Sequence, residues 1–306
     1  EKYQQIFPEF AGYVPEYSQS HLPVREQKTA EGHAVRAVYL YSAMADLAYE
    51  YKDKELLDAC KTLWEDMTKR QMYITGSIGA SGLLERFTTD YDLPNNCNYS
   101  ETCASIGLAL FGRRMAQITK DASYMDVVER ALYNTLLSGI AQDGKSFFYV
   151  NPLETLPGIS GEAKTHKHAL PVRPKWFACA CCPPNVARML SSVSEYAWHL
   201  TQDTLFSNLY IDGTLDLTEN FGGKIILETA YPYNHVVNYK FVPVKETMYV
   251  PLAIRIPAWS ENTKILMNGK PAEYEMKAGY AYIFGEYRAE DIITIELDME
   301  VKRVYT

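Results

Sequence analysis

Three of the six cysteines fall in the segment 178–185, which reads Ala-Cys-Ala-Cys-Cys-Pro-Pro-Asn. A carboxylate and a further thiol lie close together earlier in the chain, in Glu101-Thr102-Cys103. Zinc in proteins is held by sets of four ligands drawn from thiolates, imidazoles and carboxylates. The two segments together offer three thiols and one carboxylate, so the pattern predicts a zinc site that joins distant parts of the sequence.

The Cys181-Cys182 pair is followed directly by Pro183-Pro184. Proline suits the first turn of a helix, where it removes no needed N–H donor. The two thiols are therefore expected at a helix N-terminus, where the helix dipole and a metal both favour thiolate. Neighbouring cysteines rarely pair with each other, because a disulfide needs Cα atoms about 4.4–6.8 Å apart. An activated or metal-bound thiol pair is predicted; the alternative is a set of buried, inert cysteines.

The segment 72–99 is rich in glycine and in turn-forming residues, and it carries Glu85 in its middle. Loops of this length in compact domains are often functional. A retaining glycosidase needs a nucleophile and a proton donor about 5 Å apart, and an activated thiolate with Glu85 could supply them. A structural zinc site and a zinc hydrolase with water as nucleophile fit the same residues. Glu85 could also be an ordinary solvated loop glutamate.

Composition excludes several classes of partner. The net charge is −8 with acidic and basic residues interspersed, which argues against a nucleic-acid partner held by phosphate contacts. No apolar run approaches the roughly 18 residues of a membrane span, so no membrane association is expected. Clustered thiols without regular spacing are typical of metal or catalytic sites in a reducing compartment, not of a disulfide framework.

Apolar residues recur at helical spacing before about residue 200 and in short strand-like runs after it. Helices are predicted at about 26–51, 53–71, 100–119, 121–139 and 183–200, with a short strand at 146–150. The first two helices are expected to form an antiparallel helical hairpin. Strands are predicted at 205–210, 215–218, 224–231, 237–242, 247–257, 263–268, 280–284 and 292–298. Asn268-Gly269 is typical of a hairpin turn. The loop at 152–175 holds His166 and His168, a pair that could bind a metal, although loop histidines more often face solvent.

Helices followed by evenly spaced strands predict a multidomain chain, α then β. The fold class expected is a helical part followed by an antiparallel β-sandwich. The predicted domains are a helical catalytic domain at 1–203 and a β-sandwich domain at 204–306.

Five segments, in their order and spacing, resemble the zinc-dependent β-L-arabinofuranosidases of glycoside hydrolase family 127 (GH127) and their close relatives. They are Gly32-His33-Ala34-Val35-Arg36, the stretch from Thr75-Gly76 to Glu85, Asp92-Leu93-Pro94-Asn95, Glu101-Thr102-Cys103-Ala104, and Cys179-Ala180-Cys181-Cys182-Pro183-Pro184-Asn185. Ile254-Arg255-Ile256-Pro257-Ala258-Trp259 also looks like the sandwich that follows the family's catalytic domain. The resemblance implies part of an (α/α)6 helical barrel followed by a β-sandwich. Because fewer helices are predicted here than that barrel contains, the chain is expected to be part of the family's full length.

The resemblance implies a retaining exo-glycosidase that releases L-arabinose from non-reducing β-L-arabinofuranosides. Cys181 matches the nucleophile, which would form a thioglycosyl intermediate, and Glu85 matches the general acid/base. Because the acid must be protonated at working pH, the pKa of Glu85 is expected to be raised by burial or by nearby negative charge.

The resemblance also implies a metal-ligand set and a substrate-contacting set. The expected ligands of Zn2+ are Glu101, Cys103, Cys181 and Cys182. The expected substrate-binding residues are His33, Glu129 and Tyr149.

The expected partner is an L-arabinofuranosyl glycan or oligosaccharide. Neither nucleic acid nor membrane is expected as a partner, a homodimer is allowed, and the bacterial cytoplasm is the expected location. Two other interpretations of the function stay open. One is a related glycosidase with a different sugar specificity. The other is a non-catalytic carbohydrate-binding protein with a structural zinc site.

Overall fold

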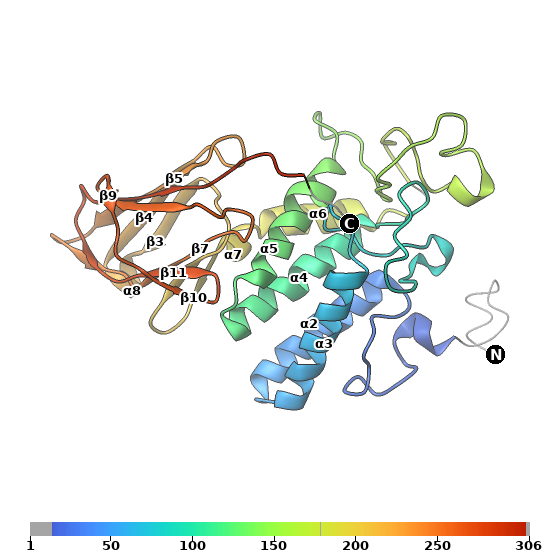
Figure 1. Cartoon of the computed structure of the whole chain (residues 1–306), viewed down its shortest axis with the longest axis horizontal. Helices are drawn as coiled ribbons and strands as arrows, with labels where there is room; N and C mark the ends of the chain where they lie inside the picture. The colour runs from blue at the N-terminus through green and yellow to red at the C-terminus, as the bar shows by residue number, and fades with distance from the viewer. Residues whose placement is uncertain (1–13, 178, 304–306) are drawn as a thin grey trace. The chain divides into compact units, whose positions relative to one another are not determined.

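The computed structural model of the chain describes residues 14–177 and 179–303 (Figure 1). Helices occupy the first part of the described chain and antiparallel-rich sheets follow them. The fold class predicted from the sequence is therefore confirmed.

The chain divides into two compact units. The first holds the residues up to Ile118 together with Val127–Ser191, and the second holds Thr119–Asp126 together with the residues from Ser192 onward. A short segment in the middle of the helical sequence thus belongs to the second unit. The domain limits at residues 203 and 204 stay a prediction.

The long helices have the following bounds: α2 (Ala34–Glu50), α3 (Lys54–Arg70), α4 (Thr102–Thr119), α5 (Ser123–Arg130) and α6 (Cys182–Ser191). Shorter helical segments are η1 (Pro15–Ser18), η2 (Leu83–Glu85), the π-helical turn η3 (Ala131–Leu136), η4 (Lys164–His166), α7 (Ser194–Ala197) and α8 (Thr218–Phe221). Helices α2 and α3 pack against each other, as the predicted helical hairpin requires (Figure 1). Within the described residues, no helix has both the length and the apolar character needed to span a membrane.

The helix predicted at 26–51 begins only at Ala34. Gly32 adopts a left-handed φ of +70°, and a Cβ at this position would lie 1.8 Å from the carbonyl oxygen of Glu16. Only glycine fits this close backbone approach, and its left-handed φ cannot continue a helix. The start of α2 is therefore set by packing, and His33 becomes its N-cap residue.

Helix α5 passes directly into the π-helical turn η3, which packs against the glycine-rich loop. The Thr135 hydroxyl donates to the carbonyl oxygen of Thr75 at 3.0 Å. Gly76 has φ +80°, and a Cβ there would lie 2.6 Å from the backbone nitrogen of Ala131. The glycine at this position thus lets the loop that carries Glu85 lie directly on the helix backbone.

The strand predicted at 146–150 is wrong. In the described chain this segment forms only isolated bridges, Phe147 with Ile140 and Val150 with Glu101. Its backbone bonds to the start of α4 instead, because the N–H of Thr102 donates to the carbonyl oxygen of Tyr149 at 2.9 Å.

The helix predicted at 183–200 is wrong in its second half. Helix α6 ends at Ser191, and Trp198–Leu200 form strand β1. The imidazole of His199 stacks on the ring of Phe206, with centroids 4.3 Å apart, in the neighbouring strand. Cross-strand aromatic packing therefore overrides the helical spacing of this segment.

The second unit contains two large sheets and a two-stranded ribbon of β12 and β6. The five-stranded sheet has the order β1-β2-β7-β11-β10, and the six-stranded sheet has the order β3-β4-β5-β13-β8-β9. The remaining strand bounds are β2 (Leu205–Ser207), β3 (Gly213–Leu217), β4 (Gly223–Thr229), β5 (Val236–Pro243), β6 (Met248–Tyr249), β7 (Leu252–Arg255), β8 (Lys264–Met267), β9 (Lys270–Pro271), β10 (Glu275–Lys277), β11 (Tyr280–Ile283), β12 (Glu286–Tyr287) and β13 (Ile292–Glu296). Strands β2 and β7 are parallel, whereas the other described pairs are antiparallel.

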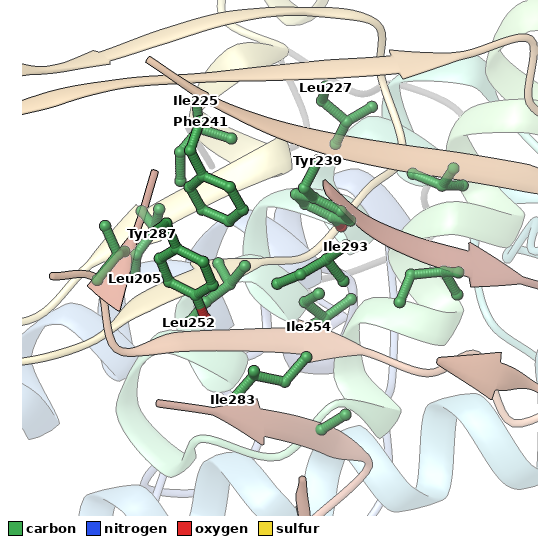
Figure 2. Packing of buried hydrophobic residues seen from close by; sticks show 14 of the residues in the cluster. Leu205, Ile225, Leu227, Tyr239, Phe241, Leu252, Ile254, Ile283, Tyr287 and Ile293 are labelled. Carbon is green, nitrogen blue, oxygen red and sulfur yellow. The ribbon is translucent and has the colours of Figure 1, made fainter. Parts of the chain in front are cut away.

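Side chains from both large sheets meet in one apolar core. Figure 2 shows Leu252 and Ile254 of β7 near Tyr239 and Phe241 of β5 and Ile293 of β13. All five are at most 1% exposed. Two sheets that share a core between their inner faces are compatible with a β-sandwich.

The hairpin turn predicted at Asn268-Gly269 is confirmed. Met267 pairs with Lys270 across the turn, in strands β8 and β9. Asn268 has φ 52° and Gly269 has φ 76°. Two consecutive positive φ values are typical of a type I′ turn, which this dipeptide favours.

Candidate metal and catalytic site

Two helix N-termini bring the candidate ligands together in the first unit. Glu101 immediately precedes α4 and Cys103 lies in its first turn, while Cys182 is the first residue of α6. The predicted position of the Cys181-Cys182 pair at a helix start is therefore confirmed. Helix N-termini favour negative charge, so this arrangement favours thiolates and carboxylates.

The four candidate ligands form a compact cluster. Their ligand atoms all lie within 4.8 Å of one another. The Cys103 sulfur lies 3.6 Å from that of Cys181 and 3.4 Å from that of Cys182. Oε1 of Glu101 lies 3.4 Å from the Cys181 sulfur and 3.7 Å from the Cys182 sulfur. Cys181 is the exposed member, whereas the other three residues are buried.

The donor set fits a zinc ion. Three free thiols and a carboxylate converge, and sulfur and oxygen ligands in fours are typical of zinc. Oε2 of Glu101 is buried and has no hydrogen-bond partner among the described residues. A buried carboxylate oxygen without a partner is costly, and a bound cation would satisfy it.

Without a metal, the cluster separates the pKa values of its thiols. Hydrogen bonding from Cys182 lowers the pKa of Cys103 to about 6. Although Cys181 is the exposed residue of the four, its sulfur is partly buried; this partial burial raises the pKa of Cys181 to about 12, and the negative charges of Cys103 and Glu101 add to it. Its hydrogen bond to Cys103, together with burial, raises the pKa of Cys182. Burial and the charges of Cys103 and Glu85 raise the pKa of Glu101 to about 8.

Glu85 adjoins this cluster through Glu101. Nε2 of His33 lies 2.9 Å from Oε2 of Glu85, and the hydroxyl of Tyr99 donates to Oε1 of Glu85 at 2.9 Å. His33, Glu85 and Glu101 have ligand-type atoms within 4.8 Å of one another. Glu85 has φ 53° and the preceding Leu84 has φ 65°. Such left-handed conformations in residues other than glycine cluster at functional sites.

The expected raised pKa of Glu85 is wrong for this structure. Burial does raise the pKa of Glu85, but the hydrogen bond and charge of His33 and the hydrogen bond of Tyr99 outweigh it. The net shift is downward. The partners of Glu85 therefore stabilise its ionised form.

A cavity of about 320 Å³ lies in the first unit, lined in part by residues that contact the cluster. Its lining includes Glu85 and Tyr149, together with Tyr99 and Phe177. The hydroxyl oxygen of Tyr149 lies 3.1 Å from the Cys181 sulfur. The expected substrate residues His33 and Tyr149 are thus brought to Glu85 and Cys181. Glu129 is buried in α5, and its part in a substrate site stays a prediction.

The histidine pair of the loop 152–175 is not within the candidate metal groups of the described residues. His166 Nε2 lies 3.3 Å from Oδ1 of Asn96, and His168 Nε2 lies 2.9 Å from the carbonyl oxygen of Cys97. Both histidines therefore fasten this loop to the segment before α4. Sequence reasoning missed Tyr99, because a tyrosine beside Ser100 carries no signal that it will reach Glu85 across the fold.

Comparison with known proteins identifies the family. The model of the β-L-arabinofuranosidase GH127 catalytic domain matches residues 4–195, and that of the GH127 middle domain matches residues 204–299. A non-reducing end β-L-arabinofuranosidase of Bifidobacterium longum subsp. longum is 38% identical over 304 residues, covering 98% of this chain and 46% of the relative.

Solved structures agree with these matches. A GH127 β-L-arabinofuranosidase from Geobacillus stearothermophilus T6 has a TM-score of 0.91 and 44% identity, covering 99% of this chain and 48% of that one. Another GH127 β-arabinofuranosidase has a TM-score of 0.84 and 35% identity, covering 93% of this chain and 46% of that one. The chain thus spans about half the length of these relatives. With its catalytic-domain match covering more than half of its residues, the chain belongs to the β-L-arabinofuranosidase family GH127.

Proposed function

We propose that this chain carries the catalytic residues of a retaining exo-glycosidase that releases L-arabinose from non-reducing β-L-arabinofuranosides. The single observation that carries the proposal is the position of Cys181. Its sulfur belongs to the four-residue cluster, of which Cys181 is the exposed member, and it lies 3.1 Å from the hydroxyl of Tyr149, which lines a cavity together with Glu85. The name of the Bifidobacterium relative supports the sugar and the activity.

In the proposed reaction, the Cys181 thiolate attacks the anomeric carbon of the arabinofuranoside. The bond to the leaving oxygen breaks as Glu85 donates its proton to that oxygen. A thioglycosyl intermediate results. In the second step Glu85 removes a proton from water, the water oxygen attacks the anomeric carbon, and the C–S bond breaks to restore the thiolate.

We propose Glu101, Cys103, Cys181 and Cys182 as the ligands of Zn2+. When bound, the ion keeps the Cys181 sulfur deprotonated near neutral pH, where its free thiol would hold its proton. The convergence of three thiols on a carboxylate oxygen without a partner supports this set.

Before Glu85 can act as an acid it must hold a proton, although His33 and Tyr99 favour its ionised form. Bound substrate would exclude water from the cavity and strengthen burial, the influence that raises the pKa of Glu85. Tyr149, His33 and Glu129 are proposed to contact the sugar hydroxyls and to position the anomeric carbon.

The remaining assignments are proposals as well. A helical catalytic domain at 1–203 and a sandwich domain at 204–306 agree with the two regions that match the family models. An L-arabinofuranosyl glycan or oligosaccharide is the proposed partner, with the bacterial cytoplasm as the location and a homodimer as the assembly to test.

The proposal is tested by zinc analysis of the purified chain beside hydrolysis of an aryl β-L-arabinofuranoside. We expect one zinc per chain and turnover, with Cys181→Ser folded but unable to hydrolyse the substrate. Turnover by Cys181→Ser would show that Cys181 is not the nucleophile. Hydrolysis of another aryl glycoside only would overturn the sugar assignment, and bound zinc with no hydrolysis of any glycoside would favour a structural metal site.

A further inference from the structure

The loop at 152–175 carries a histidine to which the proposed reaction gives no role. His168 lines the same cavity as Glu85 and Tyr99. Its Nε2 lies 2.9 Å from the carbonyl oxygen of Cys97. Because a carbonyl oxygen only accepts hydrogen bonds, Nε2 is the donor. This bond fixes the outer end of the imidazole, so the ring is a held part of the cavity wall.

The first contact of this ring is with the backbone of the loop that carries Glu85. A Cβ added to Gly82 would lie 2.9 Å from Cε1 of His168 and 3.0 Å from its Nδ1. Gly82 has φ −68° and ψ −20°, a conformation open to any residue, so the imidazole and not the backbone leaves no room for a side chain. Gly82 immediately precedes η2, whose last residue is Glu85. His168 therefore packs on the start of the turn that presents the Glu85 carboxylate.

The second contact of the ring is with Tyr99. The rings of His168 and Tyr99 have centroids 5.8 Å apart and an interplanar angle of 46°. Tilted ring pairs at this separation attract each other. The Tyr99 hydroxyl in turn donates to Oε1 of Glu85 at 2.9 Å. His168 thus supports Glu85 by two routes, one through the backbone at Gly82 and one through the Tyr99 hydroxyl.

The backbone around Glu85 is of a kind that needs support. Leu84 has φ 65° and Glu85 has φ 53°. Left-handed conformations are unfavourable for residues with a side chain, so they persist only where surrounding contacts hold them. Two backbone hydrogen bonds of 3.1 Å between Ser81 and Arg86 close the loop. The imidazole of His168 packs on Gly82 inside this closed loop, where it opposes relaxation of the strained turn.

We propose that His168 is a positioning residue that holds the Glu85 carboxylate in place for proton transfer, through its packing on Gly82 and on the Tyr99 ring. His168 itself transfers no proton. The inference rests on the proposed function, because it concerns the step in which Glu85 protonates the leaving oxygen. A general acid must lie within hydrogen-bond reach of that oxygen, so a displaced carboxylate loses rate in this step.

Two substrates that differ in their need for a proton test this role. A nitrophenolate leaves without being protonated, whereas the alcohol released from a methyl glycoside must receive the Glu85 proton as its bond breaks. In His168→Ala we expect kcat/KM to fall by about 10- to 100-fold for methyl β-L-arabinofuranoside and to change little for the nitrophenyl glycoside. An equal fall with both substrates would overturn the inference, because loss of folded enzyme or of a sugar contact affects both alike.

The matched control is His166→Ala. His166 belongs to the same loop, but its ring nitrogens are hydrogen-bonded to the side chains of Thr165 and Asn96. Its removal weakens the attachment of the loop and keeps the imidazole on Gly82, so the ratio of the two kcat/KM values should stay at the wild-type level. If the ratio shifts as far in His166→Ala as in His168→Ala, attachment of the loop is what matters and the role of His168 is refuted.

Gly82 provides an independent variant at the same contact. In the wild-type chain, Gly82→Ala places a methyl group against the imidazole and should shift the substrate ratio in the same direction as His168→Ala. In a His168→Ala background the methyl group has room, so Gly82→Ala should have no further effect. Equal effects of Gly82→Ala in both backgrounds would contradict the inference, because the two residues would then act independently.

Hydrogen exchange tests the position of the loop without any substrate. The amides of Ser81 and Arg86 are bonded across the loop, so their exchange becomes faster when the loop opens. We expect a peptide covering 81–86 to exchange faster in His168→Ala than in the wild type or in His166→Ala. Exchange at the wild-type rate in His168→Ala would overturn the inference, because the loop would then not depend on the imidazole.

The outcomes separate this inference from the proposed function. If the wild-type chain hydrolyses neither glycoside, the proposed function fails, and hydrogen exchange still decides whether His168 holds the Glu85 loop. If the wild type hydrolyses both and the ratio is unchanged in His168→Ala, the inference alone fails. If His168→Ala does not fold by circular dichroism, Gly82→Ala decides through the same ratio and the same exchange measurement.

Discussion

The hydroxyl oxygen of Tyr149 lies 3.1 Å from the sulfur of Cys181. The Tyr149 backbone is tied to the start of α4 through the Thr102 N–H, and its ring packs edge-on against Tyr99 with centroids 6.2 Å apart. The hydroxyl is therefore held in place before any substrate arrives. In this structure the Cys181 thiol donates to the Tyr149 hydroxyl oxygen. Once Cys181 is the proposed thiolate the hydroxyl becomes the donor, which stabilises the charge and orients the sulfur.

Replacing Tyr149 by phenylalanine removes this donor and keeps the ring. Hydrogen bonds to charged groups contribute about 1.5–3 kcal/mol, so we expect kcat/KM for an aryl β-L-arabinofuranoside to fall by roughly 10- to 100-fold. Zinc content should stay at the wild-type level, because Tyr149 is not among the proposed ligands. Loss of zinc in Tyr149→Phe would instead assign Tyr149 to the metal site.

Removing His33 is expected to raise the pKa of Glu85. Burial raises this pKa, and the hydrogen bond and charge of His33 lower it, so His33→Ala leaves burial less opposed. A general acid works only when protonated, so kcat/KM falls as pH rises through its pKa. In His33→Ala this fall should move to higher pH, as measured in a pH–rate profile. His166→Ala is the matched control, and an unmoved profile in His33→Ala would refute the coupling.

Zinc binding is expected to release protons in a pH-dependent manner. At pH 7 the metal-free chain holds protons on Cys181, on Cys182 and largely on Glu101, whose pKa is raised to about 8, whereas Cys103 is mostly ionised. Because ligands bind metal in their deprotonated forms, about two to three protons should leave per zinc at pH 7. At pH 9 Glu101 is largely ionised beforehand, so the release should fall to about two. Calorimetry in buffers of different ionisation enthalpy counts these protons, and a release that does not change with pH would contradict the assignment.

Gly76 is expected to be a stability hotspot. In Gly76→Ala the new Cβ would meet the Ala131 backbone at 2.6 Å with φ at +80°, whereas Gly144, with φ +68°, faces open space. Both substitutions carry the conformational cost of a left-handed residue, about 1–2 kcal/mol. Gly76→Ala should lower the free energy of unfolding by clearly more than Gly144→Ala in urea titrations. If the two variants lose the same free energy of unfolding, the loop around Gly76 can move away from η3 without an energetic cost.

The helical hairpin, the sandwich strands and the Asn268-Gly269 turn follow from local patterns, so the sequence was sufficient to predict them. The errors lie where tertiary contacts decide. Helix α2 starts late because Gly32 packs on the Glu16 carbonyl, and Trp198–Leu200 form a strand because of Phe206. The spacing of apolar residues along the sequence reveals neither of these two contacts.

In the candidate site, too, some features were predictable from the sequence and others depend on tertiary contacts. Thiol clustering and the family resemblance named Cys181, Cys103 and Glu101, which the fold brings together. The downward shift in the pKa of Glu85 was not predictable, because it comes from two partners, His33 and Tyr99, that lie far from Glu85 in any local pattern.

The two halves of the thiol cluster are separated by 78 positions between Cys103 and Cys181. An ion held by both would close a loop of that length, much as a cross-link does. In the chain-entropy treatment, closing such a loop removes about 4 kcal/mol of conformational freedom from the unfolded ensemble. Removing the ion with a chelator would therefore lower the free energy of unfolding of the whole helical unit. Its thermal stability would then depend on bound metal as directly as its turnover does.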